Sequence, residues 1–170
     1  MSYHYAMSMS SQNDSESSLD EGSSAESVQK NSIQTHEIVS SRHGDLVVVN
    51  CFTDGTLKLY DTKMLFEAIK DGKRQDGVTI AVKPRHIFSD PVNTNTFFVS
   101  CDFSGDGEYV VGGTNSAPRP GDKYELYVWD TTTGVLLDRL TGPQTILNNV
   151  CWHPTRSFIA AATSDGEFLC

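Results

Sequence analysis

The 170-residue sequence has no long hydrophobic run and no basic, apolar segment at its start. Its longest apolar stretches, Leu46–Val49 and Phe158–Ala162, are far shorter than the roughly 20 residues that a membrane-spanning helix requires. The first 15 residues lack the basic beginning and the apolar centre of a secretory signal. We therefore expect neither a membrane span nor a secretory leader.

The sequence is also poor in cysteine and in positive charge. Its four cysteines form no closely spaced pair, which favours a reducing compartment over a disulfide framework. They are Cys51, Cys101, Cys151 and Cys170. The 13 lysines and arginines are outnumbered by 22 aspartates and glutamates, so the formal net charge is −9 at pH 7. This charge excludes a strongly basic nucleic-acid-binding domain as a description of the whole chain.

Large apolar residues are scarce at the start of the chain. Residues 1–30 hold ten serines, five acidic residues and one base, Lys30. Such a stretch buries too little surface to offset the entropy lost on ordering, so residues 1–32 are predicted to be a disordered tail. Ser17, Ser18 and Ser23 each precede an acidic residue by three positions, which suits an acid-directed kinase. An unmodified, solvated acidic tail is the favoured interpretation.

From Ile33 onward the sequence has the pattern of β-strands. Leu46–Phe52 is rich in β-branched residues, Asp54-Gly55 is a hairpin-turn signal, and Thr56–Tyr60 alternates apolar and polar residues. Further strands are predicted at Phe97–Phe103, Tyr109–Val111, Tyr124–Trp129, Val135–Leu140, Ile146–Trp152 and Ser157–Thr163. The only short helix candidate is Lys63–Lys70, so the predicted fold class is all-β.

The predicted strands recur in repeats in which one strand ends with an aromatic residue followed by aspartate. Tyr60-Asp61 ends such a strand in the first repeat, and Trp129-Asp130 ends one in the second, 69 residues later. In the third repeat the turn at Asp165-Gly166 places the aromatic 42 residues after Trp129, one position past the last residue. The second interval matches the roughly 40–45-residue period of a WD-repeat propeller blade, and the first contains about 27 additional residues.

We therefore predict a partial WD-repeat β-propeller over residues 33–170, about two and a half to three blades, with residues 62–96 as an inserted segment. Closed propellers have roughly 4–8 blades, and an incomplete ring exposes unpaired strand edges at both ends. A fragment of a longer propeller is the favoured interpretation. Closure of partial rings by oligomerisation is the alternative.

Several segments are more particular than a generic WD repeat. The most discriminating are Phe103–Val111 and the Trp-His-Pro step at 152–154. Further parts of the pattern are Cys101–Gly113, Tyr124–Asp130, Leu140–Pro143 and Val150–Arg156. Together these segments resemble the retinoblastoma-binding WD-repeat subunit of COMPASS-type histone H3 lysine-4 methyltransferase complexes. The resemblance covers residues 33–170, although the family's Gly-His step before the first strand of a blade is absent.

The resemblance implies a non-catalytic, nuclear scaffold that binds other subunits of a histone methyltransferase complex. It also implies contact with nucleosomal DNA or histones through the inserted segment. A WD-repeat adaptor of another kind, such as a ubiquitin-ligase substrate receptor or an RNA-processing scaffold, is the alternative function. We expect no enzymatic activity, no cofactor and no small-molecule substrate.

One local feature is a basic segment within this acidic chain. Residues 63–85 hold six bases and three acids, a net charge of +3 within a chain of net charge −9. A basic segment of this kind can bind DNA phosphates or an acidic protein surface, and an ordinary solvated loop is the alternative. The candidate contact residues are Lys70, Lys73, Arg74, Lys83 and Arg85, with Arg119 in the long loop of the second repeat as a further candidate.

Two glycine-containing segments imitate ligand-binding loops. Asp102-x-Ser104-x-Asp106 resembles the start of a calcium loop, but Gly113 stands where that loop needs a glutamate. Gly105-x-Gly107 lacks the third glycine of a dinucleotide-binding turn and is expected to join two strands. Both segments are predicted to be tight turns in which glycine accommodates a positive φ.

The cysteines and histidines do not have the spacing of a metal site. Cys151-x-His153 together with the distant Cys101 does not match a zinc site, and both cysteines are expected to be buried in strands. His153 is expected to order the turn that follows its strand. No serine or cysteine lies in a recognisable nucleophile motif, so no catalytic, cofactor-binding or metal-binding residue is predicted.

Overall fold

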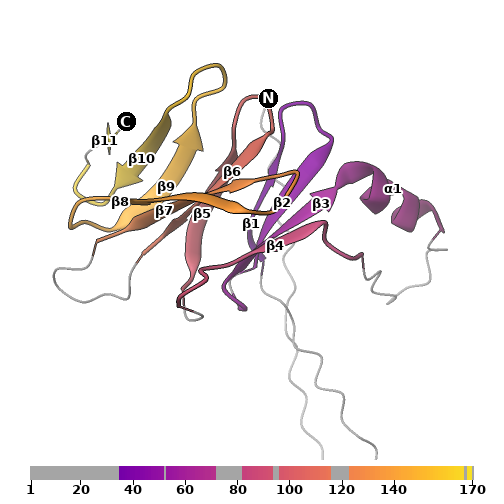
Figure 1. Ribbon diagram of the computed structural model, residues 1–170, viewed down its shortest axis with the longest axis horizontal. Helices are drawn as coiled ribbons and strands as arrows, with labels where there is room; N and C mark the ends of the chain where they lie inside the picture. Colours follow the sequence, from indigo (N-terminus) through magenta and orange to yellow (C-terminus); the bar gives the residue numbers. More distant parts are fainter. Residues whose placement is uncertain are drawn as a thin grey trace, which may run out of the picture. The chain divides into compact units, whose positions relative to one another are not determined.

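A computed structural model describes residues 35–51, 53–71, 82–93, 96–115, 123–166 and 168–169, which form three antiparallel sheets and one helix (Figure 1). The first sheet has the order β1 (Thr35–Ser40), β2 (Leu46–Cys51), β3 (Thr56–Asp61) and β4 (His86–Phe88). The second has the order β5 (Phe98–Phe103), β6 (Tyr109–Thr114), β7 (Glu125–Asp130) and β8 (Leu136–Thr141). The third contains β9 (Leu147–Trp152), β10 (Ile159–Thr163) and β11 (Phe168–Leu169). The tail predicted over residues 1–32 lies outside the described residues.

Each sheet is built from consecutive strands, as a propeller blade is, so the predicted all-β propeller class is confirmed. The predicted strands begin within two residues of the observed ones. The Asp54-Gly55 turn joins β2 to β3, with Gly55 at a φ of +64° and the Asp54 carboxylate accepting the Thr56 N–H at 3.2 Å. We number the three sheets as blades 1, 2 and 3.

The hydrophobic core consists of two clusters, one on each face of blade 2. Tyr127 and Trp129 of β7 pack into a cluster shared with β2, β3 and β4 of blade 1. Leu126 and Val128 of the same strand pack into a cluster shared with β9 and β10 of blade 3. Successive side chains of a strand point to opposite faces, and both faces of this blade are buried. This explains why β7 is a continuous apolar run and does not alternate with polar residues.

Acidic side chains connect the first strands of neighbouring blades. Strands β1, β5 and β9 each lie at the edge of their own sheet, where backbone groups lack a partner within the sheet. Glu37 of β1 accepts the Cys101 N–H at 2.8 Å, and Asp102 of β5 accepts the Trp152 N–H at 2.8 Å. Burial, followed by the proximity of Glu37, raises the pKa of the Cys101 thiol. These carboxylates therefore accept hydrogen bonds from backbone N–H groups of edge strands that have no partner within their own sheet.

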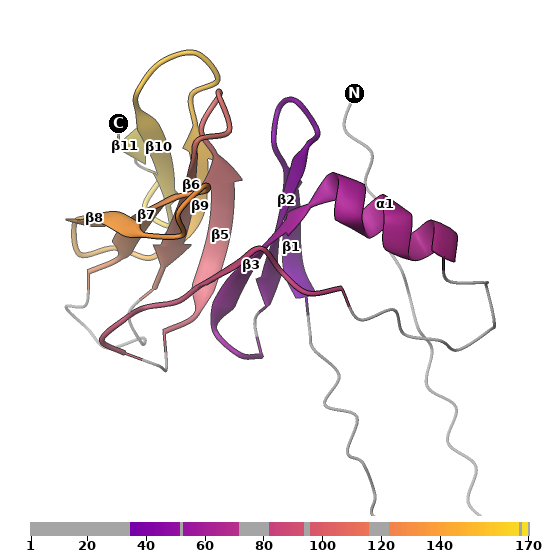
Figure 2. The ribbon, with the colours of Figure 1, turned by 45° about the vertical axis from the view of Figure 1, so that its right-hand side comes forward.

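The connection between β3 and β4 begins with helix α1 (Thr62–Asp71), which continues directly from β3 (Figure 2). The Asp61 carboxylate accepts the Lys63 N–H at 3.0 Å and thereby caps the first turn. The segment expected as an insertion over 62–96 therefore contains both this helix and the fourth strand of blade 1. Within the described residues, α1 is far from the length and apolarity that a membrane-crossing helix needs.

One prediction about the cysteines is wrong. Cys101 is buried as expected, but the Cys151 side chain is exposed. Cys151 lies between Val150 and Trp152 on β9, so it faces away from the cluster that receives Val150. In a strand, apolar residues on either side of Cys151 in the sequence therefore do not show that Cys151 itself is buried.

Candidate functional site

The three predicted basic residues that the structure describes all belong to the connection between β3 and β4 of blade 1. In an antiparallel sheet the chain reverses at alternate ends, so the β1–β2 turn and the β3–β4 connection share one end. A hydrogen bond from the Thr62 N–H to the Asp45 carbonyl, 2.9 Å long, joins these two segments. The β5–β6 and β7–β8 turns of blade 2 are joined in the same way by a bond from the Thr131 N–H to the Glu108 carbonyl, 2.9 Å. We call this end of the blades the loop end.

The structure places three of the predicted contact residues at the loop end. Lys70 lies in the last turn of α1, Arg85 immediately precedes β4, and Lys83 lies two residues before Arg85. All three side chains are exposed, and among the described residues none of them forms a hydrogen bond or an ion pair. Lys73, Arg74 and Arg119 lie outside the described residues. The side chains of Lys70, Lys83 and Arg85 thus carry positive charge that no described acidic side chain neutralises.

His86 holds the start of β4 against blade 2. Its Nε2 lies 3.0 Å from the Thr132 carbonyl oxygen in the β7–β8 turn. Its ring also stacks on Phe88, with the ring centroids 6.1 Å apart. The N–H of the preceding residue, Arg85, donates to the Leu59 carbonyl at 2.7 Å. The backbone that carries the Arg85 side chain is therefore held to β3 by this bond and to blade 2 through His86. Sequence reasoning missed this role, which requires a contact between residues 46 positions apart.

At the loop end, the β5–β6 turn is in close contact with the turn that follows β9. These two turns contain the segments that distinguish this sequence most from a generic WD repeat. The β5–β6 turn approaches Pro154 so closely that a Cβ atom on Gly105 would lie 1.8 Å from the Pro154 carbonyl oxygen. The Arg42 guanidinium of blade 1 donates to the same oxygen at 3.1 Å. The tight turn expected here is confirmed, with Gly107 at a φ of +78°. For Gly105 the expected reason was wrong, because this glycine is required by a close backbone approach.

The histidine of the Trp-His-Pro step has the role that was predicted for it. The Thr155 N–H donates to His153 Nδ1 at 3.2 Å, which orders the turn after β9. The His153 ring also contacts Phe158, with a centroid separation of 4.5 Å. Among the described residues, no three histidine, cysteine, aspartate or glutamate side chains are grouped so that they can hold a metal ion.

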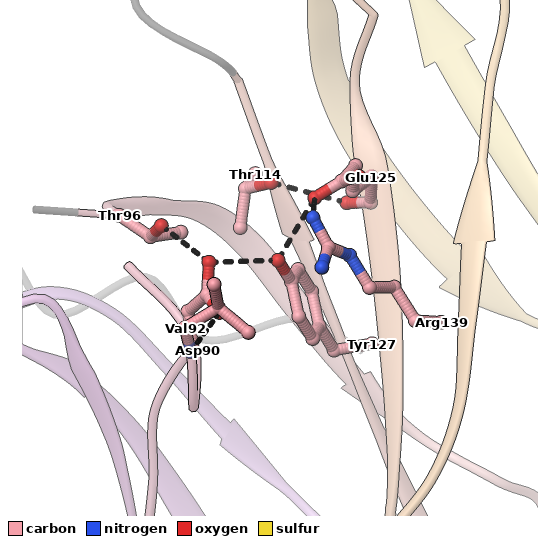
Figure 3. A network of polar contacts seen from close by, with 7 residues as sticks. All are labelled: Asp90, Val92, Thr96, Thr114, Glu125, Tyr127 and Arg139. Carbon is pink, nitrogen blue, oxygen red and sulfur yellow. Dashed lines mark hydrogen bonds and ion pairs between the residues drawn. The ribbon is translucent and has the colours of Figure 1, made fainter. Parts of the chain in front are cut away.

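A polar network at the opposite end connects blade 1 to blade 2 (Figure 3). The Tyr127 hydroxyl oxygen lies 2.9 Å from a carboxylate oxygen of Asp90 and 2.9 Å from one of Glu125. Arg139 donates to the same Glu125 oxygen at 2.5 Å, and its guanidinium lies 5.4 Å from the centre of the Tyr127 ring. Thr96 donates to Asp90 at 2.8 Å. The linker from β4 to β5 is thereby attached to the centre of blade 2.

Burial and hydrogen bonding act in opposite directions on the acid of this network. Burial raises the pKa of Asp90, but hydrogen bonds from the Val92 N–H, from Thr96 and from Tyr127 outweigh it, so its pKa lies below the usual value. Burial and the two neighbouring carboxylates raise the pKa of Tyr127 well above its usual value. The tyrosine is therefore a neutral donor at physiological pH. This chemistry fits a structural connection and offers no exposed reactive group.

The blades and their loop end define the class of protein. A family model described as "WD domain, G-beta repeat" matches residues 134–168. The β-propeller domain of Cps50 (Swd1) from Myceliophteria thermophila superposes with a TM-score of 0.59 at 25% identity, over 78% of this chain and 38% of that one. Sqt1 from Chaetomium thermophilum shares the fold with a TM-score of 0.52 at 19% identity, over 79% of this chain and 32% of that one. The chain is a WD-repeat protein with the β-propeller fold.

Sequence similarity shows which WD-repeat proteins this chain resembles. The chain is 33% identical to the retinoblastoma-binding protein 5 homologue of Drosophila melanogaster over 73% of its length and 22% of that protein. It is 32% identical to protein RBL of Arabidopsis thaliana, over 76% of this chain and 25% of that one. The COMPASS component SWD1 of Saccharomyces cerevisiae is 25% identical, over 68% of this chain and 24% of that one. The chain is thus related to the retinoblastoma-binding protein 5 and Swd1 proteins, and it spans about a quarter of their length.

Proposed function

We propose that the chain is part of a non-catalytic scaffold subunit of a nuclear histone H3 lysine-4 methyltransferase complex. The observation that carries this proposal is the 33% identity to the Drosophila retinoblastoma-binding protein 5 homologue over 125 residues. One WD repeat accounts for only about 40–45 residues, so the similarity extends across several blades. A similarity restricted to one repeat would fit any WD-repeat adaptor.

We further propose that the loop end of blade 1 contacts nucleosomal DNA or histones. Lys70, Lys83 and Arg85 are exposed there without partners among the described residues, which is the state of a side chain that is free to bind phosphate. Lys73 and Arg74 belong to the same segment of the sequence. Arg119 belongs to a different connection, between β6 and β7, and is a secondary candidate.

Removing the paired bases Lys73 and Arg74 should weaken nucleosome binding by the assembled complex and flatten its dependence on salt. Each lost phosphate contact reduces the magnitude of the slope of log affinity against log salt by about 0.9. The slope of the double alanine variant should therefore be smaller by about 1.8. A variant with Lys83 and Arg85 both changed to alanine should behave alike. Binding is measured by a titration series in increasing salt.

Lys123→Ala is the matched control, because Lys123 lies two residues before β7, at the end of blade 2 opposite to the loop end. It should leave both affinity and slope near their wild-type values. Methylation of a free histone peptide should also be unchanged in every variant. Wild-type affinity and slope in both double variants would show that the segment is an ordinary solvated surface. Loss of peptide methylation would assign the segment to complex assembly.

A further inference from the structure

Helix α1 leaves three large apolar side chains exposed, and two of them, Phe66 and Ile69, lie next to each other on one face of the helix. The exposed fractions are 59% for Phe66 and 62% for Ile69, whereas Leu65 and Ala68 of the same helix are half-buried. The packing of the helix against β3 therefore uses only its Leu65–Ala68 side. Exposed apolar residues scattered singly are common, but a cluster of them on one helix face marks an interaction site.

The exposed apolar residues lie among lysines. Residues three or four apart are neighbours on a helix, so Phe66 is adjacent to Lys63, Ile69 and Lys70 at once. Both lysines are exposed, and within the described residues their side chains form no ion pair. Glu67 borders the lysines on the side away from Ile69. We call Lys63, Phe66, Ile69 and Lys70 the α1 face.

We propose that the α1 face binds an acidic protein segment that carries apolar side chains. The lysines complement carboxylates, and the partner's apolar side chains would cover Phe66 and Ile69. A DNA backbone would engage the lysines but would leave the two apolar side chains in water, so a mixed acidic and apolar partner satisfies more of this surface. The proposal does not rest on nucleosome binding by the same segment of the chain.

The test uses the full chain and three labelled probes. The first is a synthetic peptide of glutamates interleaved with leucine and phenylalanine, the second is polyglutamate of equal net charge, and the third is duplex DNA. Fluorescence anisotropy should show that the mixed peptide binds more tightly than polyglutamate. Changing Phe66 and Ile69 together to serine should weaken binding of the mixed peptide by about tenfold or more and leave DNA binding unchanged.

Matched variants separate the face from the rest of the helix. Met64 is 56% exposed but lies on the other side of α1, so Met64→Ser should change binding of the mixed peptide less than about twofold. Phe66→Leu keeps an apolar side chain and should retain most of the affinity. Lys63→Gln combined with Lys70→Gln should weaken binding and reduce its dependence on salt. Urea denaturation should give the same midpoint for every variant.

Three results would overturn the proposal. Equal binding of polyglutamate and the mixed peptide, unaffected by the serine changes, would define a plain charged surface. A loss with Met64→Ser as large as that with the double serine variant would show that the whole helix had been disturbed. A parallel loss of DNA binding in the Phe66 and Ile69 variant would assign the face to nucleic acid. None of these results bears on the proposed complex membership, which is tested separately.

Discussion

Replacing Gly105 with alanine should lower the free energy of unfolding of the chain by about 3 kcal/mol, near the upper end of the usual cost of overpacking. The new Cβ atom would lie 1.8 Å from the Pro154 carbonyl oxygen and 2.4 Å from its carbon, so the turns of blades 2 and 3 would have to separate. Both obstructing atoms belong to the backbone, which cannot rotate aside as a side chain can. Urea denaturation of the wild type and the variant measures the difference.

Gly44→Ala is the matched control for this effect. Gly44 also lies in a turn at the loop end, but a Cβ atom there would meet nothing within 4 Å. Its φ of +74° still makes alanine unfavourable, by about 1–2 kcal/mol. Gly105→Ala should therefore cost more than Gly44→Ala even though only the latter requires a left-handed backbone. Equal costs would show that the contact between the two turns yields without strain.

Replacing Asp90 with alanine should destabilise the chain by about 2–3 kcal/mol at neutral pH, because it removes the acceptor of several buried hydrogen bonds. The donors that lose this acceptor are the Val92 N–H and the hydroxyls of Thr96 and Tyr127. Asp90 is only 6% exposed in the folded chain, so water cannot readily replace its carboxylate. Unfolding is again followed in urea, here at a series of pH values.

The effect of Asp90 should depend on pH in a defined direction. Its pKa in the folded chain lies below the usual value of about 3.9, so the stabilisation is fully present above about pH 5 and is lost as the pH falls through the folded pKa. The difference between wild type and Asp90→Ala should therefore shrink in acid. Asp138→Ala, an exposed change on β8, should cost much less, about 0.5 kcal/mol. A difference that stayed constant down to pH 2 would contradict the network of Figure 3.

The strands of blades 1 and 2 were predictable because local chemistry determines them. Asp54-Gly55 is a β-hairpin signal because it lies between two segments with the pattern of strands. The Tyr60-Asp61 and Trp129-Asp130 steps indicate the repeat. The short strand β4 was not predicted. It has three residues, too few for a recognisable alternation, and it pairs with β3 across the connection that contains α1.

The candidate site was predictable only in part. The net positive charge of residues 63–85 is visible in the sequence, and the exposure of Lys70, Lys83 and Arg85 agrees with it. The hydrogen bond between Asp90 and Tyr127 could not be predicted, because these residues are 37 positions apart and Asp90 belongs to no motif. The close approach of Gly105 to Pro154 was missed although both residues lie in the most discriminating segments, because their contact joins turns of two different blades. Such contacts arise from the packing of one blade on the next.

We propose above that the chain belongs to a scaffold subunit of a histone H3 lysine-4 methyltransferase complex. The most direct measurement is affinity purification of the protein, tagged at its native gene and expressed at its natural level, followed by mass spectrometry of the co-purifying proteins. The account predicts recovery of a histone methyltransferase subunit in near-equal amounts, together with H3 lysine-4 methylation activity in the eluate. Recovery with ubiquitin-ligase or RNA-processing subunits and without any methyltransferase would contradict it.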